Sequence, residues 1–516
     1  MIGSGLLIAA DGRGDRRALA DCWWGQSRLL GWGDSGGNRT DAANALGTVL
    51  ASTGRGRSVR GQTLEWVGPG ESRAWELPVV VAARQVTGDA VWATLDGAPV
   101  VARRRLRGLP ALVCGLDPAD VPAAVELGAI LRLALLASRR AAAWLDLEGT
   151  VVLRMDDPGA SASVQLDPWS YEKLDPEDWE EIGRLLARSD AVLTIGYTPG
   201  WVDDGDAERG ELRVGGSRVE RRPGDVHPSP LVDYRGRRAP SADCQAEFRA
   251  VADLCSRGLC TVEMHGYTHV HPELERWARA PTRHQKLGWY RELGPEVAGT
   301  LRRKAAGAHP IARGLELFER HFGEPPSVLV CPGNACGPES LERAFALGLE
   351  AVAADGLAVR RDGDLAWLPG VRNAEPDSHG SRSLGALIPA VACFHDRDLA
   401  QAGVDWLQRL LARWRSAGAD RFIDLRELTS ALGLRLALDP APEGWRLEVV
   451  RERGPALRRP FPVLVRAPDR LPAALGVVTP QGPLRLDVES VAGVEPELVD
   501  EEGYTWVRVG IRRRAG

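Results

Sequence analysis

Acidic and imidazole side chains follow three separate apolar segments of the chain. They are Asp156 and Asp157 after VVLRM, His265 and His269 after CTVEM, and His395 and Asp396 after AVACF. In barrels and open parallel sheets, reacting groups gather beyond the carboxyl ends of the strands. Three strand ends that each finish in acid or imidazole are hard to obtain from packing alone, so we expect them to form one site.

Asp157, His265 and His269 have the chemistry of a metal site. Divalent cations such as zinc bind imidazole nitrogen and carboxylate oxygen, and a catalytic site keeps positions open for water and substrate. The i, i+4 spacing of the histidines places both on one side of a helical turn, and Gly266 lets the backbone bend. His271 would point elsewhere and is a candidate to support the ligands. We therefore predict a divalent metal cofactor, with zinc favoured.

The remaining residues of the three segments suggest acid and base roles. A bound cation lowers the pKa of its water, and a neighbouring carboxylate can take the proton as that water attacks a carbonyl. Asp156, adjacent to Asp157, is placed for this role. His395 comes from a different strand and can protonate the leaving nitrogen or oxygen, with Asp396 orienting it.

Each pattern alone has a simpler explanation. An Asp-Asp pair after a strand is most often a turn or a helix cap, and histidine pairs are common on protein surfaces. A His-Asp pair after an apolar strand is equally ordinary. The combination, in this order and on a background of alternating strands and helices, favours a functional site.

The order of these motifs resembles that of the polysaccharide deacetylases, carbohydrate esterase family 4, over residues 148–433. RMDD (154–157) matches the first family motif, whose first acid is the base and whose second is a metal ligand. HGYTH (265–269) matches the spacing of the second, and CFHD (393–396) the last, whose His serves as the acid. The resemblance implies a hydrolase that removes an acyl group, typically acetyl from an N-acetylated sugar, with zinc or a similar cation.

Two positions depart from the family pattern. Gly266 stands where a hydroxyl residue is usual, and Cys331, in LVCPGNACGPESL, replaces the Arg that normally pairs with the base. The Gly/Asn loop that follows survives, with Asn334 as a candidate substrate contact. Without the positive charge we expect the pKa of Asp156 to be higher than in the family. Arg154 and Arg372 are the candidates to replace that charge.

The segments around the histidines offer candidate substrate contacts. A segment of about 48 residues of mostly irregular sequence, 196–243, lies between the first two motifs, and a loop of this length is typically a lid, a binding surface or a disordered insert. Tyr197, Trp201 and Asp203 lie near its start, and Trp277 and Trp289 follow the histidines. Aromatic faces suit sugar rings, and Asp203 lies at the end of the same strand as Tyr197, so we predict that these five residues contact substrate.

The elements that position the site indicate an α/β fold. Nearly continuous apolar strands alternate with amphipathic helices over residues 148–433, as a parallel sheet covered on both faces requires. We predict a central β/α barrel there, of the polysaccharide deacetylase type by the resemblance. Residues 434–516 contain short alternating strands bounded by Pro, Gly and Asp, which predict a small β-sandwich.

Residues 1–147 alternate apolar runs with helical patterns and predict a further α/β domain. The pattern of residues 123–145 predicts a long apolar helix. The stretch VWATLDGAPVVARRRLRGLPALVCGLDP resembles the closing segment of class I glutamine amidotransferase-like domains. No nucleophile elbow accompanies it, because ADCWWGQ lacks the glycines that strain and expose a thiol. We interpret this domain as non-catalytic.

Length and composition limit the number of domains and the kinds of partner that we expect. A chain of 516 residues favours about three domains, and a net charge of −5 gives no overall attraction to nucleic acid. Neither a signal-peptide core nor an apolar stretch of about 18 residues is present, so we expect a cytoplasmic protein without a membrane span. The eight scattered cysteines indicate reduced thiols. The expected partner is a carbohydrate or another small acylated substrate, and the oligomeric state stays open.

Two alternatives remain at this point. One is a hydrolase of a non-sugar amide or of a glycosidic bond on the same fold. A glycosidase needs two carboxylates flanking the bond, and Glu263 with Asp156 is the available pair. The other is a non-catalytic carbohydrate-binding protein with a relic site, motivated by the missing Arg.

Overall fold

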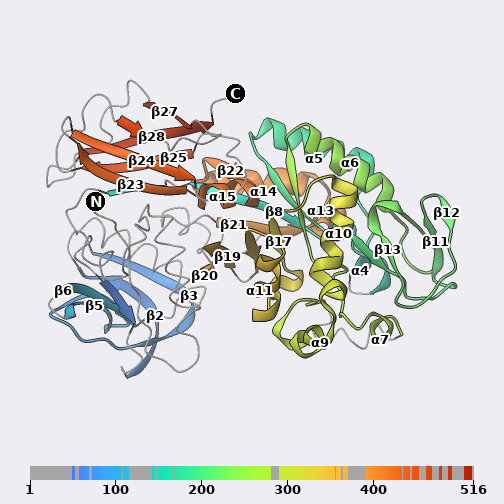
Figure 1. The fold of residues 1–516 in the computed structure, drawn as a ribbon, viewed down its shortest axis with the longest axis horizontal. Coiled ribbons are helices and arrows are strands. Elements are labelled where there is room, and N and C mark those ends of the chain that lie inside the picture. Colours follow the sequence, from blue (N-terminus) through green and yellow to red (C-terminus); the bar gives the residue numbers. More distant parts are fainter. Residues whose placement is uncertain are drawn as a thin grey trace.

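The computed structural model describes most of the central part of the chain and separate segments of both ends. The described residues are 49–52, 57–68, 72–106, 109–115, 142–145, 149–166, 169–279, 290–354, 356–361, 364–369, 390–432, 434–441, 444–451, 461–467, 476–478, 486–490 and 505–513. Figure 1 shows β-rich regions near the N-terminus (blue) and the C-terminus (orange to red), beside a larger region of helices and strands.

The central region is built on a nine-stranded sheet with the order β20-β19-β18-β17-β16-β9-β8-β21, and β22 also pairs with β8. The strands are β8 (Thr150–Asp156), β9 (Leu193–Tyr197), β16 (Cys260–Met264), β17 (Val328–Val330), β18 (Ala351–Ala353), β19 (Gly356–Arg361), β20 (Asp364–Pro369), β21 (Ala390–His395) and β22 (Arg421–Ile423). From β18 to β21 all neighbours are parallel, whereas β19 and β20 form an antiparallel hairpin at one edge.

The predicted α/β fold is therefore present, but the barrel is not closed. The sheet is a curled half-barrel, and its edge strands β20 and β21 do not pair with each other within the described residues. The antiparallel hairpin β19–β20 extends one edge of the sheet beyond its last parallel strand, β18. The sequence pattern of alternating strands and helices does not distinguish an open sheet from a closed one.

Amphipathic helices cover this sheet. They include α5 (Pro176–Arg188), α6 (Cys244–Ser256), α10 (Pro310–Phe322), α11 (Pro338–Ala346), α13 (Asp396–Ala402), α14 (Asp405–Ser416) and α15 (Leu425–Leu432), with the shorter α4 (Ala162–Gln165), α7 (Leu274–Ala278) and α9 (Ala298–Arg303). In α5 the buried Trp179, Ile182 and Leu186 face the strands. Every residue of β8 is buried, as expected for a strand covered on both faces.

The segment between β9 and α6 is ordered, contrary to the expectation of a mostly irregular loop. It forms a two-stranded sheet, β10-β13, and a four-stranded sheet, β12-β11-β14-β15, at the side of the molecule away from the two β-rich regions (Figure 1). The strands are β10 (Gly200–Val202), β11 (Gly210–Val214), β12 (Ser217–Arg218), β13 (Val226–Pro228), β14 (Val232–Gly236) and β15 (Ala242–Asp243). Short strands rich in Arg, Gly and Asp give a weak sequence signal.

The N-terminal region contains a six-stranded sheet in the order β1-β6-β5-β4-β2-β3. Its strands are β1 (Val49–Ser52), β2 (Ser58–Trp66), β3 (Arg73–Arg84), β4 (Ala90–Leu95), β5 (Ala98–Leu106) and β6 (Leu109–Cys114). The helices predicted for this domain fall largely outside the described residues. Residues 142–145, the end of the predicted long helix, form strand β7 instead.

The C-terminal region contains two sheets. One has the order β23-β24-β26 and the other β27-β28-β25-β7. The strands are β23 (Leu434–Ala441), β24 (Gly444–Arg451), β25 (Phe461–Ala467), β26 (Gly476–Val478), β27 (Leu486–Ser490) and β28 (Thr505–Arg513). Because β7 (Ala142–Leu145) pairs with β25, residues that precede the central sheet contribute to the C-terminal one. Every helix among the described residues is too short or too polar to cross a membrane.

Candidate metal and catalytic site

The three predicted strand ends meet at the carboxyl edge of the central sheet. His395 of β21 stands opposite Asp156 of β8, and Asp156 stands opposite Gly196 of β9. On the far side of β9, the backbone nitrogen of His265 donates to the carbonyl of Tyr197 at 2.8 Å. Parallel pairing thus places the acids and imidazoles of three distant segments side by side.

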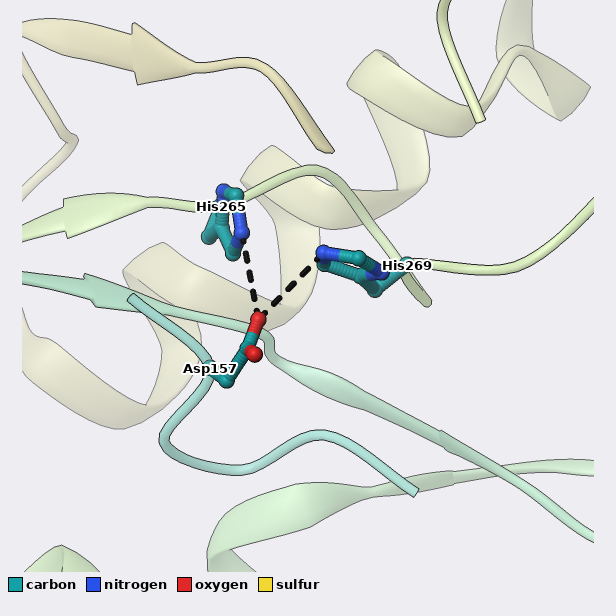
Figure 2. Close-up of side chains that lie close together, drawn as sticks. All are labelled: Asp157, His265 and His269. Carbon is teal, nitrogen blue, oxygen red and sulfur yellow. Dashed lines mark ion pairs between the residues drawn. The ribbon is translucent and has the colours of Figure 1, made fainter. Parts of the chain in front are cut away.

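Asp157, His265 and His269 converge on one point (Figure 2). Oδ1 of Asp157 lies 3.4 Å from Nε2 of His265 and 3.3 Å from Nε2 of His269. One ligand atom from each residue lies within 4.8 Å of the others, and all three side chains are buried. Two donor atoms that bind one tetrahedral ion at 2.0–2.1 Å are about 3.3 Å apart. The spacing therefore fits a small divalent cation.

A hydrogen bond orients the ring of His265, and burial governs the protonation of His269. Nδ1 of His265 donates to the carbonyl oxygen of Val330 at 3.0 Å, which turns Nε2 of the same ring toward Asp157. Burial lowers the pKa of His269 to about 4. A carboxylate oxygen and two imidazole nitrogens therefore face one another, and these are atom types that bind a divalent cation.

Arg154 supplies the positive charge beside the predicted base. Its Nε donates to Asp156 Oδ1 at 2.8 Å, and its Nη2 contacts Asp156 Oδ2. The guanidinium is 1% exposed. Burial raises the pKa of Asp156, but the charge and hydrogen bond of Arg154, together with the nearby His265 and His395, outweigh burial and the pKa falls to about 2. Arg154, one of the two candidates to replace the missing charge, therefore pairs with Asp156, and Arg372 lies outside the described residues. That the pKa of Asp156 is higher than in the family stays a prediction.

Asn334 belongs to this ion pair. Its Oδ1 accepts from Nη2 of Arg154 at 2.6 Å. Gly333 and Asn334 have φ of 59° and 55°, so the turn after β17 aims the amide at the guanidinium. The side chain predicted to contact substrate is thus bound to Arg154, while Cys331 beside it is buried.

His395 is oriented by Asp398, not by Asp396 as predicted. Asp398 Oδ2 lies 3.5 Å from Nδ1 of His395 and accepts from its backbone nitrogen at 2.9 Å. Burial acts against the charged form, but the hydrogen bond to Asp398 and the nearby acids raise the pKa of His395 to about 9. Asp396 begins α13 with its side chain fully buried and bound to Tyr171 and Lys173.

Glu292 holds the histidine turn and was missed by sequence reasoning. Its carboxylate accepts from the backbone nitrogens of Tyr267 at 2.8 Å and Thr268 at 3.2 Å, and from Thr268 Oγ1 at 2.8 Å. A Cβ on Gly266, whose φ is 68°, would stand 2.5 Å from Glu292 Oε2. The glycine that departs from the family pattern is therefore required by this carboxylate. Glu292 lies too far along the chain for spacing to signal this contact.

Gly196 is a second residue that sequence reasoning missed. A Cβ there would stand 2.7 Å from Asp156 Oδ1 and 3.5 Å from Cβ of His265. The missing side chain therefore leaves room for both groups above β9. The available signal was a glycine inside the apolar run LTIGY, since glycine in a strand often marks a close approach of other groups.

Three aromatic residues predicted to contact substrate lie in the core instead. Tyr197, Trp201 and Trp277 are each 0% exposed. Tyr197 packs against Phe248 and Phe322, and the two tryptophans belong to apolar clusters beside the inserted sheets. Their large apolar surfaces are used in packing.

The remaining predicted residues lie away from the ligands or outside the described residues. Asp203 is buried and pairs with Arg221 Nε at 2.7 Å. Nδ1 of His271 accepts from the backbone nitrogen of Glu273 at 3.1 Å, a local turn contact. Trp289 lies outside the described residues. The half-buried aromatic ring that does adjoin the acid is Trp169, whose centroid lies 6.2 Å from that of His395.

No family model and no curated protein matches the sequence. Among solved structures, the chain is similar to a carbohydrate esterase family 4 pseudoenzyme from Bacillus anthracis, with 11% identity, a TM-score of 0.29 and coverage of 56% of this chain and 68% of that one. It is similar to the carbohydrate deacetylase Agd3, with 10% identity, a TM-score of 0.36 and coverage of 99% of both chains. It is also similar to the BpsB deacetylase domain from Bordetella bronchiseptica, with 14% identity, a TM-score of 0.22 and coverage of 47% and 71%. The chain thus resembles carbohydrate esterase family 4 deacetylases in structure, at low sequence identity.

Proposed function

We propose that this chain is a metal-dependent hydrolase that removes an acyl group, N-acetyl in the simplest case, from a carbohydrate. The observation that supports it most is the buried group Asp157, His265 and His269, whose ligand atoms lie within 4.8 Å of one another. Asp156 and His395 stand beside it on adjacent strands. A carbohydrate substrate is proposed from the motif order, which resembles that of the polysaccharide deacetylases.

Asp157, His265 and His269 would hold the cation, and zinc suits two imidazoles and a carboxylate. When bound, the cation supplies a Lewis acid for the acyl oxygen and lowers the pKa of water. Gly196 keeps the space above β9 free for Asp156, and Glu292 fixes the turn that carries the histidines.

The side chains of the protein then move two protons. Asp156, ionised at neutral pH because Arg154 lowers its pKa, accepts a proton as the oxygen of water bonds to the acyl carbon. His395, whose Nδ1 faces Asp398, donates from Nε2 to the amine nitrogen as the carbon–nitrogen bond breaks. The products are a carboxylic acid and an amine, and proton exchange with solvent restores both groups.

The contacts of Glu263 and Arg154 weigh against two rival functions. Glu263, the second carboxylate that a glycosidase would need, accepts from the backbone of Ser327 and Val328 and from Arg426, and so does not flank a bond together with Asp156. The relic-site alternative depended on a missing Arg, and Arg154 occupies the place of that charge beside Asp156.

The test measures bound metal and acetate release from a panel of N-acetylated sugars. We expect wild-type protein to bind one equivalent of Zn²⁺ and to release acetate. Asp156→Asn should bind Zn²⁺ and lose turnover by at least about a hundredfold, the usual contribution of a positioned base. His269→Ala should lose both properties.

His271→Ala is the matched control, because this histidine belongs to the same segment but makes a local turn contact. It should retain metal and activity. Wild-type protein that binds Zn²⁺ without releasing acetate from any sugar would exclude the proposed substrate. Wild-type protein that binds no divalent cation would contradict the proposed function itself.

A further inference from the structure

A buried ionic cluster lies directly beneath the proposed site and is not used by the chemistry above. Lys173, in the loop between α4 and α5, is 4% exposed at its side chain. Its Nζ donates to Asp396 Oδ2 at 2.7 Å and to the backbone carbonyl of Asp157 at 3.3 Å. Oε2 of Glu247, on α6, lies 3.7 Å from the same Nζ.

The partners of Lys173 bind the surrounding backbone in turn. Glu247 Oε1 accepts from the backbone nitrogen of Gly159 at 2.6 Å, two residues after the proposed ligand Asp157. Asp396 Oδ1 accepts from Tyr171 Oη at 2.5 Å. One ammonium therefore joins the loop after β8 to the first residue of α13, which directly follows His395.

We propose that Lys173 is a positioning residue that fixes the carboxylate of Asp157 relative to His265 and His269. This inference rests on the proposed function, because it assigns Lys173 to the geometry of that site. Lysine suits the role, since its ammonium carries three donors on a flexible stem and here reaches acceptors from three segments. Residues that orient metal ligands typically change metal affinity by 10–100-fold when they are replaced.

The backbone of Asp157 needs such a constraint. Its φ is 84°, a region that non-glycine residues rarely adopt, so the surrounding contacts must hold it. The Lys173 ammonium on its carbonyl and the Glu247 carboxylate on Gly159 act on both ends of this turn. Without them the carboxylate of Asp157 is free to turn away from the histidines.

A purely structural role predicts a different result. Lys173 is also the nearest counter-charge to two buried carboxylates, Asp396 and Glu247, and removing a buried counter-charge destabilises a protein whatever it positions. The two roles separate when Asp396 is neutralised together with Lys173. The double variant Lys173→Met with Asp396→Asn removes one charge of each sign, but does not restore a donor to the carbonyl of Asp157.

The experiment measures Zn²⁺ affinity by titration calorimetry and thermal unfolding without metal. We compare wild type, Lys173→Met, the double variant and Lys304→Met, a control lysine at the end of α9. Lys173→Met should lose affinity by about 10–100-fold and unfold at a lower temperature. The double variant should regain part of its unfolding temperature while its affinity stays low, and Lys304→Met should match wild type.

Two results would overturn the inference. The first is wild-type affinity in Lys173→Met, and the second is recovery of affinity together with stability in the double variant. Neither depends on turnover, so a wild type that binds Zn²⁺ but releases no acetate would remove the proposed function and leave this test intact. A wild type that binds no Zn²⁺ would remove both.

Discussion

Arg154 and Asp156 lie two positions apart on β8, and residues at i and i+2 of a strand project from the same face. Strand β8 therefore carries both the proposed base, Asp156, and the guanidinium group that binds it. Cys331, the first residue after β17, is buried and lies within electrostatic reach of the Arg154 guanidinium. We interpret Cys331 and Arg154 as a paired exchange: the positive charge that the family pattern places at position 331 is carried here by residue 154.

Exchanging these two positions tests that interpretation. Cys331→Arg alone should destabilise the protein, because Cys331 is buried and within electrostatic reach of Arg154, and an uncompensated buried charge costs about 3–5 kcal/mol. The double variant with Arg154→Met should recover most of that loss. Thermal unfolding of both variants measures the effect, and a double variant no more stable than Cys331→Arg would contradict it.

Asp398 sets the pH range in which His395 can donate a proton. The hydrogen bond and the acids nearby raise the pKa of His395 to about 9 against the effect of burial. A raised pKa keeps the imidazole protonated at neutral pH, so turnover is lost only as the pH rises through that value. Asp398→Asn should move the alkaline limb of the rate profile toward the ordinary histidine range near about 6.5. An unchanged limb would show that another group is the acid.

At the scale of elements, the turn over residues 265–269 shows how a departure from a family pattern can be required locally. Gly266 has φ of 68°, and a Cβ there would lie 2.5 Å from both Glu292 Oε2 and Pro332 Cγ. The Glu292 carboxylate in turn accepts backbone hydrogen bonds from Tyr267 and Thr268. Side chain and backbone geometry therefore exclude the hydroxyl residue that the family pattern would place here.

Gly266→Ser restores the family residue and should impair the site. The substituted Cβ must displace Glu292 or Pro332, and we expect Zn²⁺ affinity to fall by about 10–100-fold, as for other groups that orient ligands. Gly307→Ser is the control, because a Cβ there meets no atom within 4 Å. Unchanged affinity in Gly266→Ser, measured by calorimetry, would show that Glu292 does not position the histidines.

The sequence was informative where a periodic pattern ends in a reactive side chain. The strands of the central sheet and the convergence of Asp157 with His265 and His269 follow from that pattern. The contacts of Glu292 and Lys173 could not be predicted, because neither residue stands at the end of a periodic segment or at a spacing that signals a partner. Trp201 and Trp277 were predicted to contact substrate because aromatic faces suit sugar rings, but both lie in apolar clusters of the core.

At the scale of the whole molecule, the predicted domain boundary at residue 147 separates strand β7 from the C-terminal sheet with which it pairs. Strand β7 precedes the central sheet but pairs with β25 of the C-terminal region. The chain therefore reaches its C-terminal sheet before it builds the central one and returns to it afterwards. Such a connection ties both ends of the central region to one sheet, which a boundary drawn from composition does not reveal.

The proposed site makes stability depend on metal and on pH. A ligand that binds only the folded chain stabilises it by RT ln(1 + [L]/Kd), about 2.7 kcal/mol at a hundredfold excess over Kd. We therefore expect Zn²⁺ to raise the unfolding temperature of wild type by several degrees and not that of His269→Ala.

Stability without metal should depend on the pH through His269. Its pKa is lowered to about 4 in the folded chain, whereas the unfolded chain binds a proton at this histidine below about pH 6.5. The free energy of unfolding should therefore fall as the pH drops from about 6.5 toward 4. Calorimetric scans from pH 7 to 5 measure both effects, and an equal Zn²⁺ response in wild type and His269→Ala would place the cation elsewhere.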